Sequence, residues 1–321
     1  MNSKQKNFKY KTLLKFFIYF FKFNGSISVN LDVDSQSWGF TCSKNITTII
    51  VCVVSLLHFT WFVTGLIYIL LNDHDYKNLR LFEKILYIAT KIFFIILAPL
   101  LRAIFTFRRQ KTTEIYNKLV RIKDIANVLS NSSEKIVKKS AFQAMKIFSI
   151  ALILWISQVS TSIFQQNIET FFLHTLPFLL CYLTIHSPVL EYIFLLLFIK
   201  EKFKVINELN YELPTSNKIF RTSIDIYKLQ TACKLHSELY ELSLNISQFF
   251  SLPIFLCIFQ MFSALLIYSY IIVKPLVFVE RVDYYVYLSC LFRIAQITFL
   301  LLTLNMYATS VIAEVVRKFL N

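Results

Sequence analysis

The stretch of residues 46–71, ITTIIVCVVSLLHFTWFVTGLIYILL, decides the fold class of this chain. It runs for 26 residues without an Asp, Glu, Lys or Arg. A helix needs about 20 predominantly apolar residues to cross the roughly 30 Å hydrocarbon layer of a bilayer. We therefore expect this stretch to form a membrane-spanning helix.

Five further stretches have the same apolar character, and 56% of all residues are hydrophobic. Together with the first, the predicted spans are residues 46–71, 85–107, 141–164, 173–199, 244–273 and 284–307. The gaps between them are too short for a separate soluble domain. The sequence therefore predicts an all-α polytopic membrane bundle over residues 46–307, with an N-terminal segment over 1–45 and a tail over 308–321.

The basic residues give the orientation of the bundle. Of the 34 Lys and Arg residues, 25 lie in the N-terminal segment, in gaps 108–140 and 200–243, and in the tail, whereas five lie in the other three gaps. Cytoplasmic loops retain an excess of Lys and Arg. Both termini are therefore expected in the cytoplasm. Residues 8–23 interleave lysines with aromatic residues, which predicts an interfacial helix on the inner leaflet.

Composition and motifs argue against several classes of function. The net charge of +15 is spread over the inner loops, which favours contact with anionic membrane lipids over nucleic acid. The chain has three glycines, whereas secondary transporters usually rely on Gly- or Pro-broken helices in internal repeats. There is no nucleophile elbow, Gly-rich phosphate loop or metal-ligand spacing. We therefore expect no enzyme activity, no catalytic residues, no metal and no cofactor.

Ionisable residues inside membrane spans suggest function by default. Arg102 and Lys146 each lie about five residues from the inner end of a span, so we expect both side chains to snorkel to the cytoplasmic interface. Lys91 lies nearer the outer side, and two interpretations stay open for it: snorkelling outward, or lining a cavity.

Glu191 and Arg293 lie deeper in their spans. Glu191 is 18 residues from the outer end of its span, about 27 Å down, and Arg293 is nine residues from the outer end of its own, about 14 Å down. A direct ion pair is therefore not expected. We expect Arg293 and nearby Gln296 to face a polar cavity in the outer half of the bundle. Glu191 is expected to meet water or basic groups near the inner face.

An outer cavity would also draw on aromatic and polar side chains of the third, fourth and fifth spans. Aromatic rings with a few polar groups are typical of a small-molecule pocket, although helix packing and interfacial aromatic belts use the same residues. The candidate ligand-binding residues are Lys91, Trp155, Gln158, Tyr182, His186, Gln260, Tyr268, Arg293 and Gln296.

Four stretches carry a resemblance to a known family. They are LLKFFIYFFKFNGSISVN (13–30), FKVINELNYEL (203–213), LHSELYELSLNISQFF (235–250) and ATSVIAEVVRKFL (308–320). With the cytoplasmic N-terminus and the long basic inner loops, they make the chain resemble the insect gustatory receptors, in the seven-transmembrane insect chemoreceptor superfamily. That family's strongest motif, Thr-Tyr followed by Gln-Phe in a seventh helix, is missing before the chain ends at Asn321.

The resemblance implies a function. Receptors of this family are thought to be tetrameric, ligand-gated, non-selective cation channels of the plasma membrane, with the seventh helix lining the pore. It implies a small-molecule tastant as ligand, and homo- or hetero-tetramers with other gustatory receptor subunits as the assembly. A chain that lacks the seventh helix is expected to have no pore of its own. The chemical class of the tastant, whether sugar, bitter compound or another, stays open.

Two alternatives remain beside the receptor. The first is a six-span transporter or orphan channel with both ends inside. The second is a non-signalling fragment that associates with full-length receptors. A transporter predicts saturable uptake of a solute, whereas a receptor channel predicts a cation current evoked by a ligand.

Overall fold

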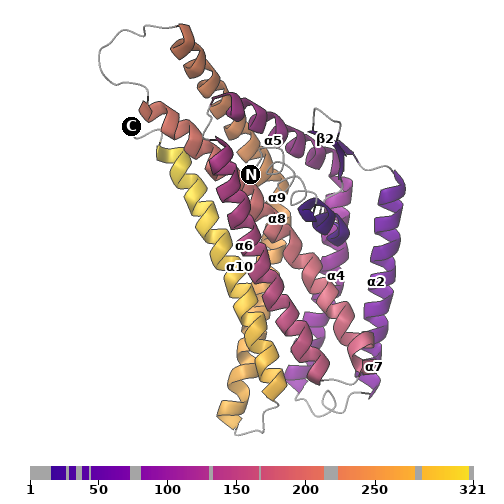
Figure 1. Cartoon of the computed structure of the whole chain (residues 1–321). Coiled ribbons are helices and arrows are strands. Elements are labelled where there is room, and N and C mark those ends of the chain that lie inside the picture. Colours follow the sequence, from indigo (N-terminus) through magenta and orange to yellow (C-terminus); the bar gives the residue numbers. More distant parts are fainter. Residues whose placement is uncertain are drawn as a thin grey trace, which may run out of the picture.

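A computed structural model describes residues 16–26, 29–33, 38–42, 45–72, 81–129, 133–165, 168–212, 223–278 and 284–317. Within this part of the chain nearly every residue is helical (Figure 1). The helices are α2 (Asn45–Asn72), α4 (Leu81–Phe107), α5 (Arg109–Leu129), α6 (Ser133–Gln165), α7 (Ile168–Thr170), the π-helix η1 (Phe171–Thr175), α8 (Leu176–Glu212), α9 (Ser223–Phe278) and α10 (Tyr284–Arg317).

The long helices follow the predicted spans. By length and apolar composition, five helical segments of the described chain are able to cross a membrane, and α2 adds a shorter apolar segment, Val51–Ile67. The five are Ile88–Phe107, Phe142–Phe164, Ile168–Asn207, Gln230–Pro275 and Tyr284–Val316. The prediction of a polytopic helical membrane bundle is confirmed.

Helix α8 is the centre of the bundle. Its most apolar window is 78% buried by the rest of the protein, against 33–44% for the other four candidate spans. It packs against α4, α6, α9 and α10, which surround it in Figure 1. A helix that is apolar on all sides is typically a buried helix. The apolar sequence of α8 on every face therefore explains its central position.

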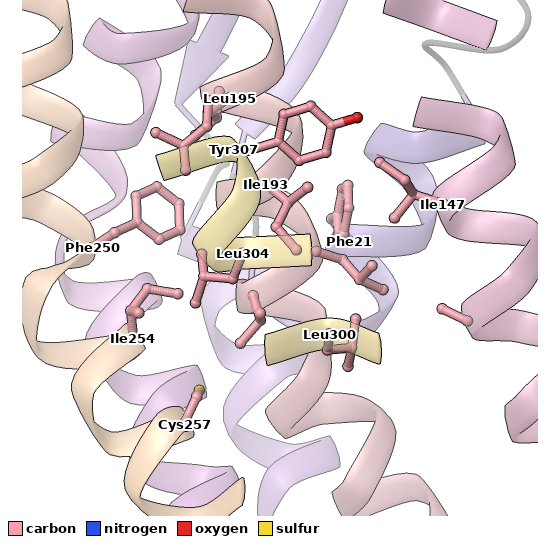
Figure 2. Packing of buried hydrophobic residues seen from close by; sticks show 14 of the residues in the cluster. Phe21, Ile147, Ile193, Leu195, Phe250, Ile254, Cys257, Leu300, Leu304 and Tyr307 are labelled. Atoms are coloured by element: carbon pink, nitrogen blue, oxygen red, sulfur yellow. The ribbon is translucent and has the colours of Figure 1, made fainter. Parts of the chain in front are cut away.

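Large apolar side chains fill the space around α8. Figure 2 shows Ile193 of α8, Leu300 and Leu304 of α10, and Phe250 and Ile254 of α9 among the buried residues. All five are buried. Burying a side chain of this size from water contributes about 1.5–3 kcal/mol to the free energy of folding. Between membrane helices the hydrophobic contribution is smaller, because the alternative environment is lipid and not water. Close van der Waals packing therefore holds this part of the bundle together.

The predicted inner loops are mostly helical, which corrects the description of residues 108–140 and 200–243 as loops. Helix α5 and the first turns of α6 occupy most of the former gap, and the ends of α8 and α9 occupy residues 200–212 and 223–243 of the latter. On α5 the side chains of Ile115, Ile122 and Ala126 are buried. They lie on one face of α5, because residues spaced by three, four or seven share a helix face, and α5 packs against α9.

A two-stranded hairpin is the exception to the all-helical architecture. Strands β1 (Val29–Val33) and β2 (Trp38–Cys42) pair antiparallel, with Leu31 opposite Phe40. The amide side chain of Asn117 on α5 holds the hairpin: Phe40 N donates to its Oδ1 at 2.8 Å, and its Nδ2 donates to Phe40 O at 3.0 Å. The hairpin thereby lies against α5, as Figure 1 shows.

Residues 16–24 form a further helix that packs into the bundle. Phe17 and Phe21 are buried. The Phe17 ring lies 5.4 Å from that of Phe148 on α6 and 4.8 Å from that of Phe194 on α8. On the opposite side of the helix Phe23 is exposed. Contact of this helix with the inner leaflet stays a prediction.

Candidate functional site

A short polar contact joins α10 to α9. Arg293 lies nine residues into α10, and its Nη1 donates a hydrogen bond to Tyr268 Oη at 2.7 Å. The guanidinium carbon also lies 5.0 Å from the centre of the Tyr268 ring. Tyr268 is buried. The arginine is therefore held by both the hydroxyl and the ring of one tyrosine.

The aromatic ring of Phe178 is shared by two cations. Lys91 Nζ of α4 lies 3.7 Å from the ring centre, and Arg293 Cζ lies 5.3 Å from it. Phe178 is two residues into α8, directly after the π-helix η1. A ring face attracts cations through its quadrupole. Phe178 thus brings together two of the predicted site residues, which come from different helices.

Two more predicted residues of α8 continue this cluster. The Tyr182 ring lies 6.1 Å from Phe178 and 4.2 Å from the His186 imidazole. Phe94 of α4 stacks on Tyr182 at 5.4 Å and lies 4.6 Å from Phe178. Residues 178, 182 and 186 are four apart and share one face of α8. We call Lys91, Phe94, Phe178, Tyr182, His186, Tyr268 and Arg293 the central cluster.

Several buried polar atoms of the cluster lack a hydrogen-bond partner among the described residues. They are Tyr182 Oη, both ring nitrogens of His186, and Arg293 Nε. Leaving such a group unsatisfied costs about 1–3 kcal/mol. No salt bridge is found between Arg293 and any residue that the structure describes. The cluster therefore offers hydrogen bonds and positive charge to a molecule that enters it.

Three other predicted residues lie on α6 and α10. Trp155 Nε1, both amide atoms of Gln158, and Gln296 Oε1 are buried and unpaired among the described residues. Helices α6 and α10 pack along one another. Among the described residues, no hydrogen bond joins these buried atoms to the central cluster.

Gln260 of α9 belongs to a different place. It lines a cavity of about 460 Å³ between α4 and α9. Phe94 lines the same cavity and stacks on Tyr182 of the central cluster. The nine predicted residues are therefore divided among the cluster, this cavity and the α6–α10 contact.

Glu191 lies farther along α8 than the central cluster, and its Oε1 accepts a hydrogen bond of 2.9 Å from the Tyr116 hydroxyl of α5. Burial of the Tyr116 hydroxyl raises the pKa of Tyr116 well above its ordinary value, and the neighbouring Glu191 carboxyl group raises it further. Tyr116 therefore keeps its proton and stays a donor. The expected water or basic partner for Glu191 stays a prediction, and a tyrosine is the partner that the structure shows.

Arg102 corrects the expectation of snorkelling. Its side chain is buried, and Nη2 donates to Thr184 Oγ1 at 2.9 Å while Nε donates to Asn24 O at 3.4 Å. Nη1 lies 3.4 Å from His58 Nδ1. The prediction was wrong because it used only the depth of Arg102 in its span. The helix of residues 16–24 lies beside the Arg102 side chain and offers it a hydrogen-bond acceptor, Asn24 O. Lys146, in contrast, is exposed on α6.

Sequence reasoning missed Phe178, Tyr116 and the role of Arg102. Phe178 is one of 33 phenylalanines, and composition gives no signal that separates it from the others. For Tyr116, the buried stripe of α5 was a signal that could have been found. The partners of Arg102, Asn24 and Thr184, are both distant from it in sequence. No local sequence pattern indicates that these segments pack together.

The comparison with known proteins agrees with this architecture. The family model described as 7tm chemosensory receptor matches residues 14–321. No curated protein matches the chain significantly. The match covers the helix of residues 16–24, all the long helices and every residue of the central cluster. The chain belongs to the 7tm chemosensory receptor family.

Proposed function

We propose that this multi-pass membrane protein is a gustatory receptor, and that it acts as a subunit of a ligand-gated, non-selective cation channel in the plasma membrane. The family assignment supports a chemoreceptor role, and a receptor family of this kind is normally non-enzymatic. The proposed ligand is a small-molecule tastant. The proposed assembly is a homo- or hetero-tetramer with other subunits of the family.

One observation carries the proposal: Lys91 and Arg293 both lie over the ring of Phe178, and Arg293 is also hydrogen-bonded to Tyr268. Small-molecule sites combine a mainly aromatic or apolar wall with a few convergent polar groups. The unpaired Tyr182 hydroxyl and Arg293 Nε would bind a ligand oxygen. A tastant that carries a hydrogen-bond acceptor beside an apolar or aromatic part fits these groups.

Ligand binding would change the balance between closed and open states only if the two states bind it differently. The cluster offers a basis for such a difference, because its residues come from four separate helices, α4, α8, α9 and α10. A ligand that draws Arg293 away from Tyr268 would change the α9–α10 contact. We therefore place the coupling between ligand and channel at this contact.

Whole-cell recording tests the proposal. The chain is expressed alone and together with a full-length receptor of the family, and a panel of tastants is applied. The expected result is a ligand-evoked, non-selective cation current that shifts its dose dependence in the Arg293→Leu variant. The matched control is Lys146→Leu, which removes an exposed cation from a span and should leave the response unchanged. Saturable solute uptake without current would instead favour a transporter.

A further inference from the structure

The cavity between α4 and α9 opens toward the surface that would face lipid. Phe93 and Phe94 of α4 form one wall, and Gln260 and Ser263 of α9 lie on the other. Leu266, which also lines it, is 74% exposed. Its volume of about 460 Å³ is within the range of small-molecule sites, about 300–1,000 Å³.

Gln260 is an unusual residue for this position. Its side chain is 1% exposed, and neither its amide oxygen nor its amide nitrogen has a partner among the described residues. It lies 18 residues before the end of α9 at Phe278, about 27 Å along the helix axis. An unsatisfied amide deep in a bilayer is costly. Something that enters the cavity is needed to complete its hydrogen bonds.

The rest of the wall restricts what that can be. None of the residues that line the cavity is Asp, Glu, Lys, Arg or His. The Ser263 hydroxyl already donates to Phe259 O at 2.9 Å, and the other polar side chains of the lining are those of Thr90 and Tyr270. The rest of the lining is apolar, and the cavity is far larger than the roughly 30 Å³ that one water occupies, which favours a larger, mainly apolar occupant. The occupant should carry one uncharged group that exchanges hydrogen bonds with an amide.

We propose that this cavity, bounded by Phe94, Gln260 and Ser263, is a lateral binding site for uncharged lipophilic molecules with one carbonyl, hydroxyl or amide group, which enter from the bilayer. The apolar part occupies the space beside Phe93 and Ser263, and the polar group binds the Gln260 amide. The site shares Phe94 with the central cluster but is not lined by Lys91 or Arg293, and it does not depend on the proposed tastant function.

Phe94 connects the two places physically. It lines the cavity and stacks on Tyr182 at 5.4 Å. A molecule in the cavity therefore touches a residue that belongs to the central cluster. Occupancy of the lateral site would limit the rotamers available to Phe94, and would thereby act on the cluster without contact with its charged groups.

Photolabelling of the full chain in phosphatidylcholine vesicles tests the site. Two diazirine probes of matched length are used, a long-chain 2-alkanone and the corresponding alkane, and the labelled residues are mapped by mass spectrometry. The expected result is labelling by the ketone on α4 and α9 around the cavity. Gln260→Leu should lower that labelling by about tenfold, as expected for loss of a buried hydrogen bond.

Controls make the outcome decisive. Gln248→Leu makes the same chemical change at an exposed position of α9 and should leave labelling unchanged. Ser263→Phe fills the cavity and should remove labelling while a normal melting curve shows that the variant is folded. Equal labelling by both probes, unaffected by Gln260→Leu, would show that a lipid chain fills the groove nonspecifically. Absence of labelling by either probe would show that the cavity is closed or covered. Either result would overturn the proposal.

Discussion

Arg293 of α10 donates a hydrogen bond of 2.7 Å to the Tyr268 hydroxyl of α9, and its guanidinium carbon also lies 5.3 Å from the centre of the Phe178 ring on α8. Arg293 thus contacts both of the helices that precede α10. The guanidinium group lies in an apolar helix without a salt bridge to a carboxylate among the described residues. This relationship is the basis of the first prediction.

Loss of the Arg293 side chain should weaken the response to ligand without preventing expression. Arg293→Leu removes a charged hydrogen-bond donor, and hydrogen bonds to charged groups contribute about 1.5–3 kcal/mol. The half-maximal ligand concentration should therefore rise by at least about tenfold. Surface expression and whole-cell current are measured in parallel. A variant that responds normally would remove Arg293 from the site.

Tyr268→Phe distinguishes the contribution of the hydroxyl from that of the ring, because it removes only the hydroxyl. The Tyr268 ring remains 5.0 Å from the guanidinium carbon in the parent geometry, so this variant should have a smaller effect than Arg293→Leu. We expect a shift of about threefold to tenfold in half-maximal concentration, which corresponds to one hydrogen bond. The matched control is Tyr284→Phe, at an exposed position of α10. A shift of equal size in both variants would contradict a specific role for the Tyr268 hydroxyl.

Gly25 should not tolerate a side chain. Its φ is +79°, and a Cβ built there would lie 2.8 Å from Arg102 Cγ. The left-handed conformation alone costs a residue with a side chain about 1–2 kcal/mol. Gly25→Ala should therefore lower the thermal stability of the purified protein in detergent. The helix of residues 16–24 should also become more accessible to protease.

The double variant Gly25→Ala with Arg102→Ala checks the cause. Removal of the arginine side chain relieves the close approach, although it also removes hydrogen bonds to Thr184 and Asn24. The loss of stability in the double variant should be smaller than the sum of the two single losses, because neighbouring residues are not additive. Strict additivity would show that the Gly25 effect comes from backbone conformation alone.

Tyr116 and Glu191 should show a coupling free energy across the α5–α8 contact. Their hydrogen bond is 2.9 Å long, and a buried carboxyl that loses its donor pays for desolvation. A double-mutant cycle with Tyr116→Phe and Glu191→Ala should give a coupling of about 1–2 kcal/mol in thermal or denaturant stability. An exposed tyrosine of α9, Tyr227, provides the control Tyr227→Phe. Coupling below about 0.3 kcal/mol would show that the bond contributes nothing to stability.

Packing should outweigh charge at the α5–α9 contact. Lys118 pairs with Glu241 at 2.6 Å and Arg121 with Glu238 at 3.1 Å. Glu238 is 21% exposed and the other three side chains are 40–64% exposed, so the double variant Glu238→Gln with Glu241→Gln should cost about 1 kcal/mol or less, and high salt should remove the difference. Leu239 lies between the two glutamates in the sequence of α9 and is fully buried. Leu239→Ala should cost about 2–5 kcal/mol. The reverse order of effects would contradict this account.

The sequence by itself determined the membrane bundle and the depths of its charged residues. Apolar stretches of about 20 residues have one stable solution in a bilayer, a helix whose backbone satisfies its own hydrogen bonds. The rise per residue then separates Glu191 from Arg293, and the structure gives each a different partner, Tyr116 and Tyr268. Depth is a local property, and the sequence encodes it directly.

Only the tertiary structure decided which side chains meet at a given depth. Phe178, Lys91 and Arg293 come together because α8 lies at the centre of the bundle, and rotation of α8 about its axis would replace this contact with another. Arg102 turns inward because the helix of residues 16–24 brings Asn24 O to it. The rotation of a helix about its axis, and the position at which the helix of residues 16–24 packs into the bundle, depend on packing between segments far apart in the sequence. No periodicity within a single segment specifies them.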